Sequence, residues 1–260
     1  MEKSKIKIII FIVVLLLFII SYPKADNIIE NFFENKDYVR ITRVIDGDTA
    51  VAGNQTIRLL GINTPEKGEK YYNEAKKYLE KRILNKTVRL IYGEDKKDLY
   101  KRTLAYIYFN GTNINKEIIE KGYGNIYFPS GKTEYYSEFF ESWNNCIKKE
   151  IRLCESSEEV CGICVKLDKI DYKNQVIVLK NSCGVDCDLY GWSIKDEGRK
   201  NFMFDDFILD SGEKVSIIVK KGTSNKTHIF WEDYSYVMTN SGDSIFLRDS
   251  NGKLVDWKSY

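Results

Sequence analysis

The sequence contains a single histidine, His228, among its 260 residues. A cysteine nucleophile is commonly activated by a histidine base, so the chain offers no support for a catalytic thiol. A strong charge imbalance is also missing, because 40 basic and 38 acidic side chains leave a net charge of +2. The hydrophobic content of 43% and aromatic content of 13% indicate a globular protein rather than a disordered one. Its length is sufficient for two domains.

The small net charge hides an uneven distribution along the chain. Residues 1–36 carry a net charge of +1, and residues 157–260 carry −3. Residues 37–156 hold 21 basic and 17 acidic side chains, which gives +4. A mildly basic middle segment is compatible with a polyanionic ligand but does not require one.

The longest apolar run, Ile8–Ile20, lies near the N-terminus and follows Lys3, Lys5 and Lys7. Its length suits a signal-peptide core and falls short of the roughly 20 residues of a spanning helix. No clean small-x-small cleavage site follows, so we favour an uncleaved membrane anchor over a removed signal for residues 1–26. A buried core helix is the less favoured alternative. Either export route predicts a body outside the cytoplasm, held at the cell membrane or secreted.

Six cysteines form an even set, and an exported protein is expected to hold disulfides. The spacing of the last four also fits a structural zinc site, with a C-x2-C pair followed 18 residues later by a C-x3-C pair. Disulfides are the preferred interpretation, zinc is the main alternative, and free thiols are the least favoured. The cysteines are Cys146, Cys154, Cys161, Cys164, Cys183 and Cys187.

From residue 37 the pattern becomes short alternating segments separated by turn residues, which indicates a β-rich unit. Asp46-Gly47 and Asn110-Gly111 are tight-turn dipeptides. Five strands with a helix inserted after the third describe a small OB-type barrel with three helices over residues 37–156. The predicted strands are 38–45, 49–52, 55–62, 87–92 and 102–109, and the predicted helices are 69–84, 114–122 and 133–149.

Helical periodicity disappears after about Val165, and short strands recur at intervals near ten residues. Asp210-Ser211-Gly212 and Asn251-Gly252 read as hairpin corners. We therefore predict an all-β sandwich domain over residues 160–260. Its clearest strand segments are 175–181, 190–196, 207–222 and 243–257.

Four short stretches of the predicted barrel carry side chains that could take part in catalysis or metal binding. Taken singly, each has an ordinary explanation, such as a hairpin turn for Asp48 or a helix-capping role for Glu66. Taken together, they supply what phosphodiester hydrolysis needs. Asp48, Asn63 and the Thr64 carbonyl offer oxygen ligands to a hard cation. A carboxylate can activate water, and the arginines at 58 and 102 can bind a phosphate.

The order of the motifs IDGDT, RLLGINTPE, DLYKRTLAYIY and INKEIIEKGYG resembles the staphylococcal nuclease family from about Asp37 to Glu155. The resemblance implies a five-stranded OB barrel with three helices. It also implies a calcium-dependent endo- and exonuclease that acts on DNA and RNA and leaves 3′-phosphates. By motif position, the implied catalytic residues are Arg58, Glu66 and Arg102, and the implied calcium ligands are Asp48, Asn63 and the Thr64 carbonyl.

In this resemblance Glu66 acts on the attacking water, while Arg58 and Arg102 act on the phosphoryl transition state. Two departures from the family pattern stand out: Asn63 where Asp is usual, and Lys101 where Gly is usual. Asn keeps an oxygen but removes a negative charge, so we expect weaker calcium binding, roughly tenfold or more. Lys101 replaces a residue that adopts positive φ at low cost, so the loop presenting Arg102 is expected to differ in shape or to gain a phosphate-binding charge.

The second half resembles the lamin-tail domain, an immunoglobulin-like sandwich, in the segments LYGWSIKD, FDDFILDSGEKVSIIV and TNSGDSIFLRDSNGKLVDW. Such domains accompany secreted or anchored nucleases and hydrolases, which implies attachment to a surface or protein partner, or presentation of the substrate. We expect Trp192, Trp231 and Trp257 to be core or corner residues. Asp243 and its acidic neighbours could bind calcium, but solvated turns are the preferred expectation.

The leading hypothesis is an anchored or secreted, calcium-dependent nuclease of extracellular DNA and RNA, expected to be monomeric. The main alternative is a non-catalytic nucleic-acid-binding module on a nuclease-like barrel, which Asn63 alone favours. A surface adhesion protein dominated by the sandwich is the third class.

Overall fold

The computed structural model describes residues 37–260, so the predicted anchor or signal segment over residues 1–26 lies outside the described residues. Among the residues that are described, no helix is both long enough and apolar enough to cross a membrane. Residues 38–260 form one compact unit. The predicted domain bounds of 37–156 and 160–260 stay a prediction.

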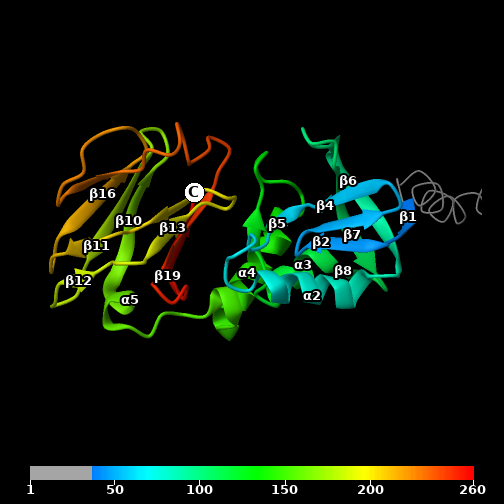
Figure 1. The fold of residues 1–260 in the computed structure, drawn as a ribbon, viewed down its shortest axis with the longest axis horizontal. Coiled ribbons are helices and arrows are strands. Elements are labelled where there is room, and N and C mark those ends of the chain that lie inside the picture. The colour runs from blue at the N-terminus through cyan, green and yellow to red at the C-terminus, as the bar shows by residue number, and fades with distance from the viewer. Residues whose placement is uncertain (1–36) are drawn as a thin grey trace, which may run out of the picture. The chain divides into compact units, whose positions relative to one another are not determined.

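The first half of this unit is built on a seven-stranded sheet (Figure 1). A separate two-stranded ribbon pairs residues 61–63 with residues 125–127 in antiparallel fashion. In spatial order the main sheet contains β1 (Asp37–Arg40), β6 (Thr87–Lys97), β7 (Thr103–Phe109), β4 (Gln55–Leu59), β3 (Thr49–Ala52) and β2 (Arg43–Asp46), with β8 (Thr112–Asn113) paired to β7; the ribbon contains β5 (Gly61–Asn63) and β9 (Asn125–Tyr127).

Two of the predicted strands are divided in the structure. The segment 38–45 is interrupted at Ile41-Thr42, and the segment 55–62 is interrupted at Leu60. The second break depends on Gly61, whose φ is 76°. A Cβ at Gly61 would lie 2.7 Å from a ring carbon of Phe139, so a larger residue would meet both backbone strain and a clash. The break turns the chain out of the main sheet and starts β5.

Three helices accompany the barrel sheet, as predicted, and pack against it (Figure 1). The apolar spacing in the first of them places Ala75, Leu79 and Ile83 on one face, and all three are buried. In the second helix the Asn113 side chain accepts a hydrogen bond from the Lys116 N–H, which caps the helix start. The helices are α2 (Tyr72–Ile83), α3 (Ile114–Glu120) and α4 (Tyr136–Lys149), followed by the 3-10 turn η1 (Arg152–Cys154) and the short helix α5 (Val160–Cys164).

The second half is β-rich and contains two four-stranded sheets and a two-stranded ribbon (Figure 1). Apolar side chains from both four-stranded sheets share one core, in which Trp192 and Trp231 are almost completely buried as predicted. The first sheet contains β10 (Val165–Asp171), β11 (Val176–Asn181), β16 (Lys214–Ile218) and β17 (His228–Phe230); the second contains β14 (Asn201–Met203), β13 (Ser193–Lys195), β18 (Ser244–Arg248) and β19 (Leu254–Ser259); the ribbon pairs β12 (Cys187–Asp188) with β15 (Ile208–Leu209).

One of the two predicted hairpin corners is wrong. β18 and β19 pair across Asn251-Gly252, as expected. Asp210-Ser211-Gly212 instead carries the chain from β15, which pairs with β12, to β16, which pairs with β11. Turn residues predict that the chain changes direction, but they do not predict which strands pair, because the partner strand can lie far away in the sequence.

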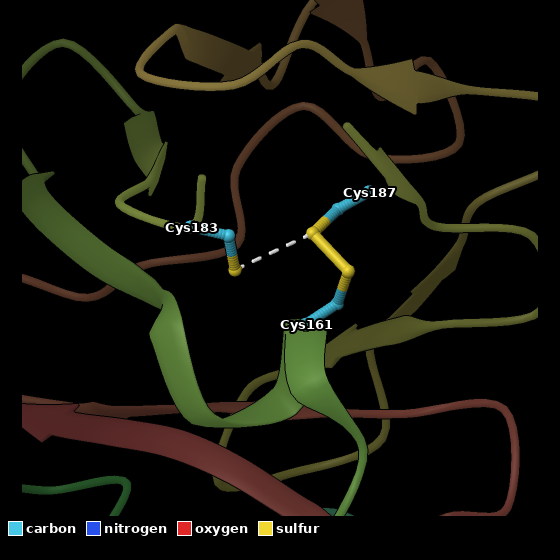
Figure 2. A group of neighbouring side chains, drawn as sticks. All are labelled: Cys161, Cys183 and Cys187. Atoms are coloured by element: carbon cyan, nitrogen blue, oxygen red, sulfur yellow. Dashed lines mark hydrogen bonds between the residues drawn. A yellow bond between two sulfur atoms is a disulfide. The ribbon is translucent and has the colours of Figure 1, made fainter. Parts of the chain in front are cut away.

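All six cysteines are joined in disulfides, so the zinc alternative is not supported. Cys146–Cys154 links α4 to η1, while Cys161–Cys187 and Cys164–Cys183 tie α5 and its C-terminal end to the second half. Figure 2 shows the Cys161–Cys187 bond with Cys183 beside it. The sulfurs of Cys183 and Cys187 lie 3.6 Å apart, because the two disulfides are adjacent. This proximity explains why the cysteines resemble a set of zinc ligands. A sulfur held in a disulfide is not the thiolate that zinc requires.

Aromatic side chains join the two halves. Trp143 of α4 is fully buried, and its ring centroid lies 5.3 Å from that of Phe246 and 5.9 Å from that of Trp257. Phe246 and Trp257 belong to β18 and β19, so they contribute to the core of the barrel rather than only to their own sheet. The predicted core or corner role of Trp257 is thus realised at the junction between the halves.

Candidate active site

The two candidate arginines are brought together by strand pairing. β4 and β7 run parallel, with Ile57 opposite Thr103 and Arg58 opposite Leu104. This register places Arg102, which immediately precedes β7, beside the part of β4 that carries Arg58. Both side chains line one cleft of about 510 Å³. Residues that are 44 positions apart in the sequence therefore face the same space.

Arg58 is 6% exposed and fixed by three groups. Its Nη1 donates to the Leu59 carbonyl oxygen at 2.6 Å. Its Nη2 lies 3.2 Å from Asp48 Oδ2 and donates to Asn63 Oδ1 at 3.3 Å. A buried guanidinium held in this way is positioned in advance for an anion.

Arg102 is held by the loop before β7. Its Nε lies 2.6 Å from Asp98 Oδ2, and its backbone N–H donates to Asp98 Oδ1 at 2.9 Å. Burial alone would raise the pKa of Asp98, but the hydrogen bonds and charge of Arg102 hold that pKa below its usual value. Lys101, in the same loop, adopts a φ of 63°, so the loop keeps the positive φ that glycine normally supplies.

Asp48 links the two turns that carry the candidate metal ligands. Its Oδ2 accepts hydrogen bonds from the Thr64 N–H at 3.0 Å and from the Thr64 hydroxyl at 3.1 Å. Asp46 lies at the same turn, and burial together with the Asp48 charge raises the pKa of Asp46 to about 6. Sequence reasoning treated Asp46 as a turn residue only. Its proximity to Asp48 could have been inferred from the D-G-D spacing.

The donor set at these turns fits calcium. Asp46 and Asp48 supply carboxylate oxygens, and Asn63 and Thr64 supply carbonyl oxygens, which are the hard ligands that calcium prefers. Two neighbouring carboxylates also repel each other, as the raised pKa of Asp46 shows, and a divalent cation would relieve that repulsion.

Asn63 makes a contact that the sequence did not reveal. Its side chain is buried, and its Nδ2 donates to the carbonyl oxygen of Gly198, from the second half, at 2.7 Å. Asn125 lies opposite Asn63 in the β5–β9 ribbon, and its Nδ2 donates to the Glu197 carbonyl oxygen at 2.9 Å. The residue that departs from the family pattern is therefore a hydrogen-bond donor to the loop between β13 and β14, a role that aspartate could not fill.

Glu66, the candidate general base, forms an ion pair with the same loop. Its Oε1 lies 2.6 Å from Arg199 Nε, and the two side chains are 41% and 64% exposed. Solvent-exposed pairs of this kind are weak, typically below about 1 kcal/mol. Glu66 is not itself among the residues that line the cleft, but Arg199 is.

Three buried acids of the second half line the cleft: two lie in the loop Asp196–Lys200, and Asp243 immediately precedes β18. Asp196, Glu197 and Asp243 are each at most 7% exposed, so the expectation of a solvated turn for Asp243 is wrong. Burial raises the pKa of Asp196 to about 6, and burial raises the pKa values of Glu197 and Asp243 to about 7. The Asp243 side chain turns inward because its Oδ1 accepts hydrogen bonds from the N–H groups of Glu197 and Ser244.

Comparisons with known proteins agree with this architecture. Residues 56–153 match the family described as staphylococcal nuclease homologue, and residues 164–260 match the lamin tail domain. The chain is similar to a thermonuclease of Staphylococcus hyicus, with 30% identity over 129 residues that cover 45% of this chain and 76% of the relative. It also resembles a thermonuclease of Staphylococcus intermedius, with 26% identity over 60% of this chain and 99% of the relative.

An uncharacterized endonuclease of Haemophilus influenzae is 38% identical over 34% of this chain and 51% of its own length. The chain belongs to the staphylococcal nuclease family and carries a lamin tail domain after the nuclease domain. These relatives indicate a nuclease activity and nucleic-acid substrates.

Proposed function

We propose that this protein is a calcium-dependent phosphodiesterase that cleaves DNA and RNA and leaves 3′-phosphates. The observation that carries the proposal is the cleft shared by Arg58, Arg102 and Asn63. Asp48 lies against Arg58, and Glu66 follows at the next turn. No residue of the implied set is replaced by a group that lacks the required chemistry; Asn63 keeps its oxygen.

The proposal assigns these side chains successive roles in hydrolysis. Glu66 removes a proton from a water molecule, whose oxygen then forms a bond to phosphorus. The bond from phosphorus to the 5′-oxygen breaks, and that oxygen takes up a proton from solvent water as it leaves. Arg58 and Arg102 donate hydrogen bonds to the phosphoryl oxygens as negative charge grows there. Calcium held by Asp48, Asn63 and Thr64 would supply further positive charge to the phosphate.

The ion pair between Arg199 and Glu66 must open before Glu66 can accept a proton. Because the Arg199 side chain is 64% exposed and the Glu66 side chain is 41% exposed, water screens the pair and opening costs little. The incoming phosphate is an alternative partner for the Arg199 guanidinium.

The decisive experiment measures cleavage of single-stranded DNA and RNA by the full chain in mild detergent, with calcium and with a chelator. Calcium-dependent products that end in a 3′-phosphate are expected. Glu66→Gln should lower turnover about 10²- to 10⁴-fold without changing the melting temperature. Glu74→Gln, an exposed change on α2, is the matched control. Binding without any cleavage in calcium would instead identify a non-catalytic nucleic-acid-binding module.

The cellular location is a separate proposal. The apolar segment near the N-terminus suggests attachment at the cell membrane or secretion, with residues 37–260 outside the cytoplasm. Three disulfides support an oxidising compartment, where they persist. Protease treatment of intact cells tests the location: external digestion is expected, and full protection with reduced cysteines would contradict it.

A further inference from the structure

The loop Asp196–Lys200 is fixed against the barrel. Its ends are closed by the Asp196 N–H donating to the Lys200 carbonyl oxygen at 3.1 Å and by the Lys200 N–H donating to Asp196 Oδ1 at 2.9 Å. Its middle accepts the amide hydrogen bonds of Asn63 and Asn125. Glu197 Oε2 also accepts from the Phe128 N–H at 3.0 Å. Because these hydrogen bonds are largely buried, they hold the loop in a fixed position at the side of the cleft.

Side chains from the second half complete this wall, which we call the tail wall and define as Arg199, Lys200, Tyr234 and Tyr236. All four line the cleft that also contains Arg58 and Arg102. Tyr236 is 55% exposed, and the Lys200 Nζ lies 3.9 Å from its ring centroid. Exposed aromatic rings beside cationic groups have surface available for a ligand.

The chemistry of the tail wall matches one class of ligand. Cationic side chains attract phosphates, and tyrosine rings stack on nucleobases. Bases in a duplex are stacked on one another, so ring faces on a protein surface are reached by unpaired bases. A cleft that combines cations, tyrosines and a candidate hydrolytic site therefore suits single-stranded nucleic acid.

We propose that Lys200, Tyr234 and Tyr236 form a subsite for nucleotides next to the scissile phosphate, so that the second half selects single-stranded substrates. The proposal rests on the proposed nuclease function for the identity of the reacting phosphate. The tyrosines stack on bases, and the Lys200 ammonium binds the phosphate between them. The tail domain is then part of the substrate site rather than a separate attachment module.

The test measures binding rather than cleavage, so that failure of the nuclease activity is distinguishable from failure of the subsite. A fluorescent short oligothymidylate is titrated into the full chain in mild detergent with chelator present, and anisotropy gives Kd. Tyr236→Leu should weaken binding about 5- to 100-fold, while Tyr236→Phe should retain it. Tyr190→Leu, another exposed tyrosine of the second half that does not line the cleft, is the control.

Lys200→Gln provides an independent measurement. The slope of log K against log salt should fall by about 0.7, the value for loss of one phosphate contact to a single strand. A duplex of the same sequence should bind more weakly than the single strand, and Tyr236→Leu should not change its affinity. Agreement of these results would support the subsite whether or not cleavage is found.

Three results would overturn the proposal. The first is an unchanged Kd and salt slope in both variants, with the melting temperature preserved. The second is equal or tighter binding of the duplex. The third is a rise in turnover for Arg199→Gln and Tyr236→Leu without weaker binding, because the tail wall would then be an inhibitory lid.

Discussion

The barrel and the second half line the same cleft with different kinds of residue. The barrel contributes Arg58 and Arg102, which belong to short motifs and are held by Asp48 and Asp98. The second half contributes Arg199 and tyrosines from loops without any such motif. Sequence motifs identify functional residues whose partners lie nearby in the chain. The residues of the tail wall reach the cleft only because distant segments pack together, so no motif identifies them.

Because buried aromatic side chains join the two halves, we expect them to unfold as one cooperative structure, and the largest expected effect tests this. Trp143→Ala should lower the free energy of unfolding by about 3–5 kcal/mol, because it removes a fully buried indole that contacts Phe246 and Trp257. Calorimetry of the full chain should show a single transition at lower temperature.

Trp231→Ala, in the core of the second half, is the matched variant and should shift the same transition. Two separate transitions, each moved by only one of the substitutions, would show that the halves unfold independently. The tail wall would then lack the rigid support inferred from the aromatic junction.

Much of the barrel could be predicted from sequence, because its strands, helices and turns depend on local periodicity. Ala75, Leu79 and Ile83 lie on the buried face of α2 that their spacing predicts. β9 was not predicted because its three residues carry too little pattern, although they position Asn125. The sequence predicts only a weak calcium ligand at Asn63. Its partner, Gly198, is 135 residues away, and nothing near either residue signals the contact.

The next effect concerns three buried acids, of which Asp243 is the one expected in a solvated turn. Asp196, Glu197 and Asp243 have pKa values raised to about 6, 7 and 7, mainly by burial. A raised folded-state pKa gives stability that is fully present below the unfolded value near 4 and is lost as pH rises through 6 to 7. Unfolding should therefore cost about 1–3 kcal/mol more at pH 5 than at pH 8. The charged or titratable side chains near these three acids include Lys132, Lys195, Lys200 and Tyr260.

Urea titrations at both pH values would measure the difference. Asp243→Asn preserves an oxygen acceptor for the N–H groups of Glu197 and Ser244, so it should reduce the pH dependence while keeping the fold. Asp171→Asn is the control, because the Asp171 pKa is lowered to about 2 and does not titrate in this range. An equal pH dependence in the Asp243 variant would show that the buried acids are not its source.

Asn63→Asp separates the metal role of residue 63 from its structural role. The added carboxylate should lower the calcium concentration for half-maximal activity about tenfold, since ligand charge tunes such sites. It should also weaken the loop contact, because a carboxylate cannot donate to the Gly198 carbonyl.

Asn125→Asp removes the comparable amide donor to Glu197 without altering a candidate calcium ligand. It should therefore loosen the loop and leave the calcium requirement unchanged. If both substitutions shift the calcium requirement equally, residue 63 acts through the loop and not as a ligand.

The smallest effect is expected at Lys101, whose φ of 63° is costly for a side chain with a Cβ. Lys101→Gly should raise the free energy of unfolding by up to about 1 kcal/mol, and Lys101→Gln should leave it nearly unchanged because the strain persists. Both variants remove the same charge beside Arg102, so an equal rise in KM would assign phosphate binding to that charge. A rise confined to the glycine variant would instead show that the left-handed lysine positions Arg102, so the barrel side of the cleft would depend on a residue that departs from the family pattern.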